Sequence, residues 1–206
     1  MKKAALVDIG NVILHLDFKT SLQKLIPKEL ADPVARIHSL MEKKNVYEAG
    51  ELSDEDFIEW ASQKLQFEGD AEQFLAAWCD IFTLNTSMYE TLRDLKSRGL
   101  KLILFSNTNQ LHVNFFLKEF AEVFELFDGQ VFSHEIGCSK PDPQMYHKAF
   151  EKYDLVPEET LYFDDLPENV TTGLQLGLKA WRYSSASHEA LTRWLVEELD
   201  PLEGTV

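Results

Sequence analysis

Short runs of consecutive apolar residues alternate along the chain with longer segments in which apolar residues recur every three or four positions. The runs cover residues 4–7, 102–105, 130–132, 161–163 and 180–183. A continuous apolar run predicts a strand that is buried on both faces, and the recurring pattern predicts amphipathic helices between the strands. The alternation therefore predicts an α/β protein with a doubly wound, Rossmann-like parallel sheet, whose ligands bind at the carboxyl ends of the strands.

Helix boundaries are marked by local signals. Gly99 ends the helical spacing of residues 88–95, because glycine commonly stops a helix. Asp142 followed by Pro143 offers an N-cap and a first helical residue for a helix that continues to residue 153. Further helices are predicted over residues 169–176 and 188–199.

The first and second strands are separated by about 95 residues, whereas a βαβ unit needs only ~30. The intervening sequence predicts four short amphipathic helices that begin near Ser21, Asp32, Ser53 and Asp70. Their apolar faces include Val34, Ile37, Leu40, Met41, Phe57, Trp60, Ala61, Leu65, Phe74, Ala77, Trp78 and Ile81. We therefore expect a helical cap of residues 18–82, placed over the strand tips and inserted into a core of residues 1–17 and 83–206.

Two features of this insertion bear on function. Residues 47–51 interrupt two of its helices, and a loop there either reaches the site and selects the substrate or is a plain connection. Both readings stay open. Trp60 and Trp78 lie on apolar helix faces and are expected in the bundle core.

The charge balance excludes several partners. Twenty basic residues against thirty-five acidic residues give a net charge of −15, and lysines and arginines form no dense cluster. Nucleic acid and anionic membranes are therefore poor partners, and no obligate protein partner is evident. An anionic substrate would need a local positive field, from a metal, a lysine or a helix N-terminus.

The sequence shows neither a targeting or membrane-spanning segment nor a zinc-binding motif. No window approaches the ~18 uninterrupted apolar residues of a membrane span, and the apolar run after Met1 is too short for a signal peptide. We expect a cytoplasmic protein. Cys79 and Cys138 show no zinc-binding spacing and are expected to be small buried or half-buried residues.

Acidic residues follow two of the predicted strands. Asp8 ends the first apolar run, and Asp164 and Asp165 end the fourth. Adjacent carboxylates at a buried strand tip repel one another unless a cation neutralises them. Magnesium prefers oxygen ligands, so these acids predict a Mg²⁺ site if Asp8 converges on the pair.

Two further strand tips carry polar residues that complete a phosphoryl-transfer set. Ser106 with Asn107 can bind phosphoryl oxygens, Lys140 can offset charge, and Asp8 can attack phosphorus. Each residue alone has an ordinary explanation. The acids and Ser106 are turn or capping types, and a lysine before Pro141 usually points into solvent.

Taken in order, the four motifs resemble the haloacid dehalogenase superfamily of hydrolases, in its branch with a helical cap between the first two motifs. The motifs are Asp8-Ile9-Gly10-Asn11-Val12-Ile13, Ser106-Asn107-Thr108-Asn109, Lys140-Pro141 and Phe163-Asp164-Asp165. Within that branch they look most like bacterial sugar-phosphate phosphatases of the α-D-glucose-1-phosphate phosphatase type. The resemblance implies a Mg²⁺-dependent phosphoric monoester hydrolase that acts on a small phosphorylated metabolite, such as a sugar phosphate.

The resemblance also implies a role for each motif residue. Asp8 would be the nucleophile and a magnesium ligand, and the Gly10 carbonyl a second ligand. Ser106 and the N–H of Asn107 would bind the phosphoryl group, and Lys140 would neutralise charge. Asp165 would bind magnesium directly, and Asp164 directly or through water. Residues 11–18 match the flap that joins core to cap.

One departure from the family pattern concerns position 10, where phosphatases usually carry a second aspartate as general acid and base. Gly10 keeps the carbonyl but removes the proton donor, which is typically worth ~10²- to 10⁴-fold. His15 or Asp17 in the flap are candidate replacements. Two alternatives follow: a metal-independent 2-haloacid dehalogenase, or a non-catalytic phosphate-binding or regulatory protein.

Overall fold

A five-stranded parallel sheet forms the centre of the protein. The computed structural model describes residues 2–200, and the strand order in the sheet is β5-β4-β1-β6-β7. The strands are β1 (Ala4–Val7), β4 (Lys101–Ser106), β5 (Gly129–Phe132), β6 (Thr160–Asp164) and β7 (Lys179–Arg182), each parallel to its neighbours. The predicted α/β fold with a Rossmann-like parallel sheet is confirmed.

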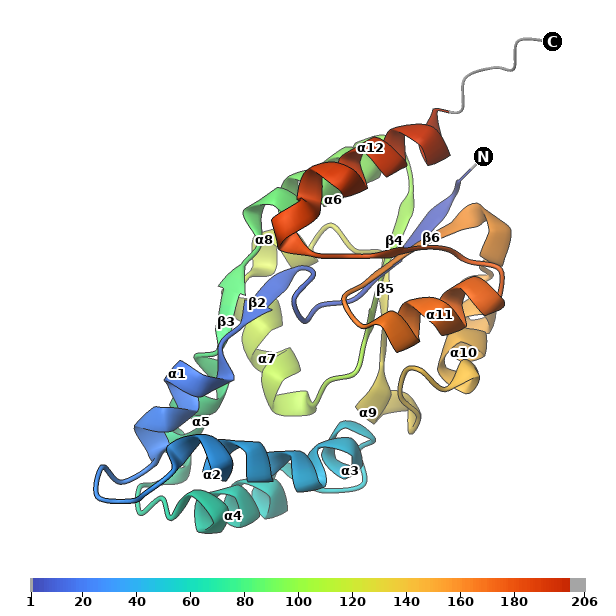
Figure 1. Cartoon of the computed structure of the whole chain (residues 1–206). Coiled ribbons are helices and arrows are strands. Elements are labelled where there is room, and N and C mark those ends of the chain that lie inside the picture. Colours follow the sequence, from blue (N-terminus) through green and yellow to red (C-terminus); the bar gives the residue numbers. More distant parts are fainter. Residues whose placement is uncertain (1, 201–206) are drawn as a thin grey trace, which may run out of the picture.

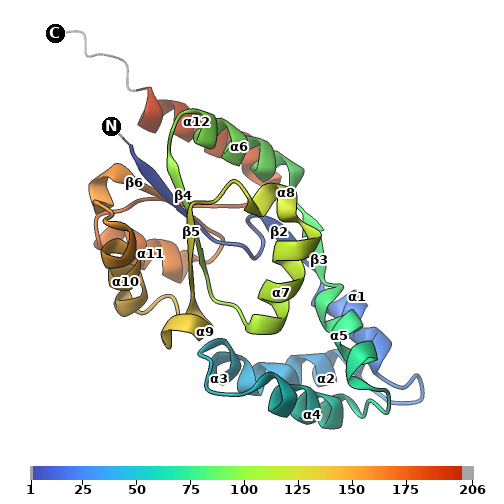
Figure 2. The ribbon, with the colours of Figure 1, turned by 180° about the vertical axis from the view of Figure 1, so that it is seen from behind.

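Helices cover both faces of this sheet (Figures 1 and 2). Alternate strand residues point to opposite faces, so each strand contributes to two apolar clusters. One cluster joins the sheet to α6 (Thr86–Ser97), α7 (Gln110–Glu119) and α12 (His188–Leu199). On the other face the sheet packs against α10 (Pro143–Tyr153), with α11 (Pro167–Gln175) contacting β6 and β7. Two short helices, α8 (Ala121–Phe124) and α9 (Ser133–Ile136), flank β5.

Side-chain caps start the helices nearest the strand tips. Asn109 accepts a hydrogen bond from the backbone N–H of His112 at the start of α7, and Asp142 accepts one from Gln144 at the start of α10. Pro143 is the first residue of α10, as predicted. Ser106 is not the cap of α7, because Asn109 takes that place.

A two-stranded antiparallel ribbon links the core to the inserted segment. It pairs β2 (Leu14–Leu16) with β3 (Phe82–Leu84), so the chain enters and leaves the insertion side by side. Asn85 anchors the ribbon, since its amide donates to the Val12 carbonyl at 2.8 Å and to the Tyr183 hydroxyl at 2.7 Å. The sequence did not predict this ribbon, because three-residue strands carry too little periodicity to be seen.

The inserted segment is helical and has its own apolar cluster, apart from the sheet (Figure 1). Its helices are α1 (Phe18–Leu22), α2 (Pro33–Ser39), α3 (Lys44–Glu48), α4 (Asp54–Leu65) and α5 (Ala71–Cys79), with 3₁₀ turns η1 (Gln23–Leu25) and η2 (Leu40–Lys43). Two further 3₁₀ turns, η3 (Pro157–Glu159) and η4 (Ser185–Ser187), lie in the core. The helices lie below the carboxyl ends of the strands in Figure 1, and the exact cap boundaries at residues 18 and 82 stay a prediction.

Several details of the insertion differ from the sequence prediction. Val34 in α2 is 54% exposed and Met41 in η2 is 42% exposed, so the predicted apolar face that runs through these two elements is fully buried only at Leu40 of η2. Trp78 lies in the cluster, but Trp60 is half-buried and packs at its edge beneath the ammonium of Lys43. The predicted interruption at residues 47–51 lies slightly later in the structure, since residues 47 and 48 end helix α3 and residues 49–53 form the connection to α4.

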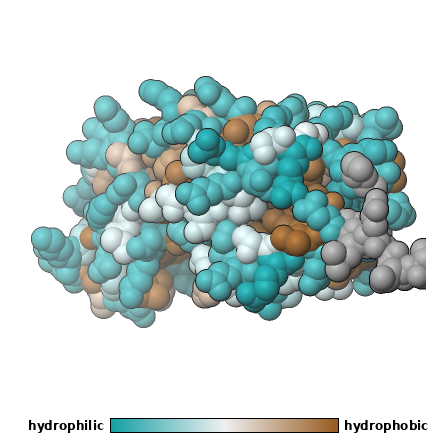
Figure 3. All heavy atoms as spheres, turned by 90° about the horizontal axis from the view of Figure 1, so that it is seen from above, coloured by the Kyte–Doolittle hydropathy of each residue, from teal (hydrophilic) through white to brown (hydrophobic). Residues whose placement is uncertain are grey.

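The surface agrees with the acidic composition. Hydrophilic residues cover most of the face shown in Figure 3, and hydrophobic areas there are small and separated. Within residues 2–200 there is no helix with both the length and the apolar character that a bilayer crossing requires. Cys79 is buried and Cys138 half-buried, and both are free thiols.

Candidate active site

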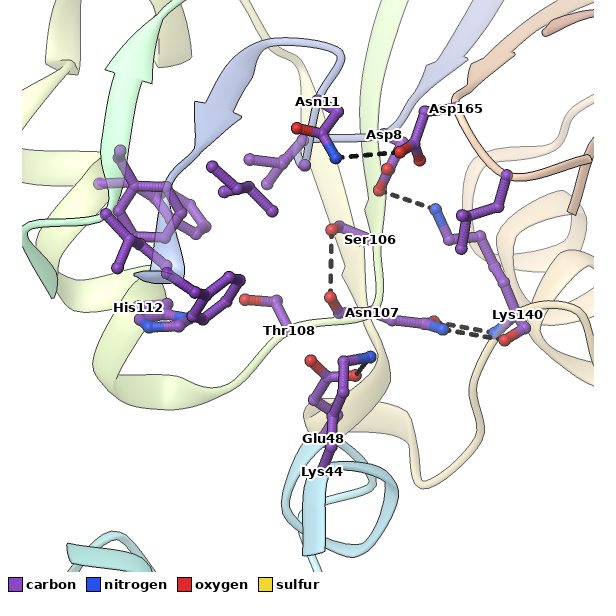
Figure 4. Close-up of a pocket in the computed structure, with 18 of the residues that line it drawn as sticks. Asp8, Asn11, Lys44, Glu48, Ser106, Asn107, Thr108, His112, Lys140 and Asp165 are labelled. Atoms are coloured by element: carbon purple, nitrogen blue, oxygen red, sulfur yellow. Dashed lines mark hydrogen bonds and ion pairs between the residues drawn. The ribbon is translucent and has the colours of Figure 1, made fainter. Parts of the chain in front are cut away.

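Each of the four sequence motifs contributes residues to one pocket at the carboxyl ends of β1, β4 and β6 (Figure 4). The pocket has a volume of about 200 Å³. Its floor comes from the core loops, and its opposite wall comes from α3 of the insertion. Parallel strands bring their carboxyl ends to one edge, which is why residues up to 157 positions apart meet here.

Asp8 follows β1 directly and is held at the floor of the pocket. Its backbone N–H donates to the Phe163 carbonyl at 2.9 Å, and its side chain is largely buried. Burial raises the pKa of the Asp8 carboxyl to about 7, against the opposing effect of the Lys140 charge. The charge of Asp164 raises the pKa further.

Lys140 is the positive centre of the site and is buried. Its ammonium donates to Asp8 Oδ1 at 2.8 Å, to Asp164 Oδ2 at 2.6 Å and to the Phe105 carbonyl at 2.8 Å. Burial alone would lower the pKa of Lys140, but the charges of Asp164 and Asp8 outweigh it and hold the pKa above its usual range. The solvent-exposed loop lysine that the sequence allowed is therefore excluded.

The two adjacent acids differ in how they are bonded. Both oxygens of Asp164 are occupied: Oδ2 accepts from Lys140 and from the Tyr162 hydroxyl, and Oδ1 accepts from the Leu166 N–H and the Asn169 amide. Asp165 is half-buried, and its side chain accepts a hydrogen bond from the amide of Asn11 at 3.1 Å. Burial raises the pKa of Asp165, and Asp164 adds to that shift.

Three carboxylates converge in this pocket with a single lysine between them. Ligand oxygens of Asp8, Asp164 and Asp165 all lie within 4.8 Å of one another. The three negative charges exceed the one positive charge of Lys140, so a bound cation would relieve the remaining repulsion. Hard carboxylate oxygens suit magnesium, and the donor set therefore fits the predicted ion.

Ser106 is the last residue of β4 and Asn107 follows it, beside this cluster. Ser106 is 3% exposed and lies between Asp8 and Asn107 in Figure 4. The side chain of Asn107 binds the backbone of Lys140 twice: its amide donates to the carbonyl at 2.8 Å, and its oxygen accepts from the N–H at 2.8 Å. The sequence assigned Asn107 only through its backbone N–H and did not predict this second contact.

Gly10 also lines the pocket, and the side chain of Leu16 occupies the space beside it. A Cβ at position 10 would lie 3.1 Å from Leu16 Cδ1, a flexible side chain of β2. Leu16 lines the same pocket. The flap therefore places an apolar side chain where a residue larger than glycine would project.

Comparison with known proteins supports a family assignment. A profile of haloacid dehalogenase-like hydrolases matches residues 2–177. The chain belongs to this family. Over 190 residues it is 25% identical to a D-ribitol-5-phosphate phosphatase of Bacteroides thetaiotaomicron, a match that covers 88% of this chain and 92% of the relative.

Solved structures share the fold of this hydrolase. A predicted HAD-like family hydrolase from Porphyromonas gingivalis matches with a TM-score of 0.77 and 24% identity, covering 95% of this chain and 98% of that one. A HAD family enzyme from Bacteroides thetaiotaomicron, solved as a magnesium complex, matches with a TM-score of 0.78 and 22% identity, covering 93% and 98%. These structures show the shared fold, and the profile match over residues 2–177 confirms the family of hydrolases that the sequence motifs suggested.

The two flap candidates for a proton donor lie in other environments in this hydrolase. Asp17 caps α1 by accepting from the Thr20 N–H at 2.9 Å, and this hydrogen bond lowers the pKa of Asp17. His15 lines a neighbouring surface hollow together with Arg182 and is not among the residues that line the site pocket. Neither candidate is supported by these contacts.

Three ionisable residues of the hydrolase pocket were not assigned a role from the sequence. Lys44 and Glu48 reach it from α3, and His112 closes it from α7. The ring of His112 is buried, stacks on Trp78 at 4.9 Å between centroids and contacts the Trp78 carbonyl and the Asn109 amide. Lys44 had no signal in the sequence. Glu48 lies in the segment 47–51, for which a loop that reaches the site was one of two open readings, and it lines the pocket as the last residue of α3.

Proposed function

We propose that this hydrolase is a magnesium-dependent phosphatase that acts on a small phosphorylated metabolite, a sugar or polyol phosphate, through an aspartyl-phosphate at Asp8. The convergence of Asp8, Asp164 and Asp165 within 4.8 Å, beside the buried Lys140, is the observation that carries this proposal. Ser106 and Asn107 share the pocket and supply neutral donors. The site thus combines a nucleophile, donors and a cation-binding oxygen set.

The ion would be held by Asp8, Asp165 and the Gly10 carbonyl. Asp164 would act through water, because both its oxygens already accept hydrogen bonds. Magnesium, when bound, neutralises the carboxylates and the oxygens of the substrate phosphate. This local positive charge, with Lys140, would overcome the net charge of −15 that repels an anionic substrate at long range.

The reaction proceeds in two displacements at phosphorus. A carboxylate oxygen of Asp8 attacks phosphorus, and the bond from phosphorus to the ester oxygen breaks, so that its electron pair leaves with that oxygen. The Ser106 hydroxyl and the Asn107 N–H donate hydrogen bonds to the phosphoryl oxygens during transfer. Water then attacks phosphorus, inorganic phosphate leaves, and the Asp8 carboxylate is regenerated.

Relatives support the substrate class. The chain aligns over most of its length with a D-ribitol-5-phosphate phosphatase and with an enolase-phosphatase E1 of Aquifex aeolicus, the latter at 25% identity over 201 residues. The first name specifies the phosphate ester of a small polyol, and the second also names a phosphatase. Residues 18–82, as a cap over the pocket, would exclude water during transfer and open for release.

The test is phosphate release from a panel of esters by purified wild-type protein and by the Asp8→Asn variant. The panel holds D-ribitol 5-phosphate, α-D-glucose 1-phosphate and p-nitrophenyl phosphate, each with and without magnesium. We expect magnesium-dependent turnover by the wild type and none by Asp8→Asn, whose circular dichroism should be unchanged. Turnover by Asp8→Asn comparable with wild type would refute the phospho-Asp8 intermediate.

A further inference from the structure

Departure of an alkoxide from phosphorus is assisted by a proton at the leaving oxygen, and on the core side of this pocket every ionisable side chain among the described residues already has another role or partner. Gly10 has no side chain. Lys140 is held by Asp8, Asp164 and a backbone carbonyl. Protons for the leaving group must therefore come from elsewhere in the pocket.

His112 is also committed. Its Nε2 lies 3.1 Å from the Trp78 carbonyl, which can only accept, so Nε2 carries the proton. Its Nδ1 then accepts from the Asn109 amide at 3.1 Å. Burial lowers the pKa of His112 to about 4, so near neutral pH the ring is neutral and its one proton is held in the hydrogen bond to the Trp78 carbonyl.

The remaining candidate for a proton donor is an ion pair on α3. Lys44 Nζ lies 2.8 Å from Glu48 Oε2, and both residues line the pocket that contains Asp8 and Ser106. The Glu48 side chain is 13% exposed and that of Lys44 is 41% exposed, so the pair faces the pocket and still reaches solvent. In Figure 4 both side chains extend from α3 toward Asn107, on the side of the pocket opposite Asp8. A substrate bound through its phosphate at Asp8 would direct its ester oxygen to that side.

Contacts on both sides fix the position of α3. Tyr47 stacks on Phe57 with ring centroids 4.0 Å apart, and its hydroxyl donates to Asp54 at 2.7 Å, which ties α3 to the rest of the insertion. On the core side, Gly50 lies against the backbone of His134, where a Cβ would come within 2.5 Å of the carbonyl oxygen. These contacts hold Lys44 and Glu48 over the strand tips, as a catalytic group requires.

We propose that Lys44 donates the proton to the leaving oxygen and that Glu48, through the ion pair, holds Lys44 in place. This inference rests on the proposed phosphatase function. As the ester bond breaks, its electron pair takes a proton from the Lys44 ammonium, and the products are a neutral alcohol, phospho-Asp8 and a Lys44 amine. When water attacks phospho-Asp8, the amine takes a proton from that water, and the ammonium is restored.

The test compares two esters of similar shape, phenyl phosphate and p-nitrophenyl phosphate, in wild type and Lys44→Met. The nitrophenolate is a weak base that departs without a proton, whereas phenolate gains from one. We expect Lys44→Met to lower kcat/KM by about 100-fold for phenyl phosphate and by under about 10-fold for p-nitrophenyl phosphate. Glu48→Gln should also lower kcat/KM for both esters, by smaller factors than Lys44→Met.

Lys43→Met is the matched control, because the Lys43 ammonium lies over the Trp60 ring at 5.0 Å from its centroid. Lys43→Met should leave kcat/KM unchanged for both esters. Equal losses for the two esters in Lys44→Met, or no loss, would overturn the proton-donor role while wild-type turnover still supports the phosphatase. Absence of wild-type turnover on both esters and on the sugar phosphates would instead reject the proposed function, and this inference with it.

Discussion

The side chain of Asn107 holds the backbone of Lys140 through two hydrogen bonds, one to the carbonyl and one from the N–H, both 2.8 Å long. Asn107 and Lys140 lie 33 positions apart in the sequence: Asn107 directly follows β4, and Lys140 lies in the loop after α9. The Asn107 side chain therefore fixes the backbone position of Lys140. From that position the Lys140 ammonium reaches Asp8 and Asp164.

Asn107→Ala should impair catalysis while keeping the backbone N–H that we propose binds the phosphoryl group. Loss of the two side-chain bonds lets the Lys140 backbone shift, and a misplacement of about 1 Å can cost ~10²-fold in rate. The unpaired backbone groups should also lower the free energy of unfolding by about 1–3 kcal/mol. Steady-state kinetics and urea unfolding measure the two effects. Asn114→Ala, on the exposed side of α7, is the control, and full activity of Asn107→Ala would contradict this role.

Removal of magnesium should abolish phosphate release. Chelation by EDTA leaves three carboxylates around one lysine, and added magnesium should restore turnover. Asp165→Asn should raise the magnesium concentration needed for half-maximal activity by at least about 10-fold, since a neutral amide is a weaker ligand for a hard cation. Halide release from a 2-haloacid that is unaffected by EDTA would select the dehalogenase alternative.

The sequence was sufficient to place the residues that the strand order itself brings together. Asp8, Ser106 and Asp164 each follow a continuous apolar run, so parallel pairing alone puts them at one edge. It was not sufficient to separate the roles of Asp164 and Asp165. Their difference depends on Tyr162 and Asn169, which bond Asp164 and not Asp165, and neighbours of this kind are set by tertiary packing.

The insertion was harder to predict in detail than the core. Ser53 and Asp70 mark helix starts through capping chemistry, and both cap helices as expected. The helix at residues 44–48 has no side-chain cap, and its five residues are too few for a clear period. It forms because Tyr47 packs into the aromatic cluster and Gly50 meets the core, and these contacts are long-range.

Stability should fall in acid partly because of His112. The folded protein keeps the pKa of this ring at about 4 against an ordinary value of 6.5, so between these values the unfolded chain binds a proton that the folded protein does not. Stability from this difference is complete above about pH 6.5 and is lost as pH falls to about 4, on the order of 3 kcal/mol in total. Urea unfolding across this pH range should show that the free energy of unfolding depends less on pH in His112→Gln than in wild type. The same pH dependence in both proteins would contradict this assignment.

The contact between Gly50 and His134 should set the working position of α3. Gly50 has a φ of +76°, and an added Cβ would lie 2.5 Å from the His134 carbonyl oxygen, so Gly50→Ala must both strain the backbone and push α3 away from the core. Gly99→Ala is the matched control, because Gly99 has a φ of +83° with open space around its Cβ position and therefore carries the strain without the collision.

Both variants should lose about 1 kcal/mol or more of unfolding free energy from the backbone strain. Only Gly50→Ala should lose activity, with a fall in kcat/KM of about 10-fold or more on sugar phosphates, because Lys44 and Glu48 move with α3. Thermal unfolding and steady-state kinetics on the two proteins separate these effects. Equal activity in Gly50→Ala and Gly99→Ala would mean that the Gly50 contact does not position the pocket wall.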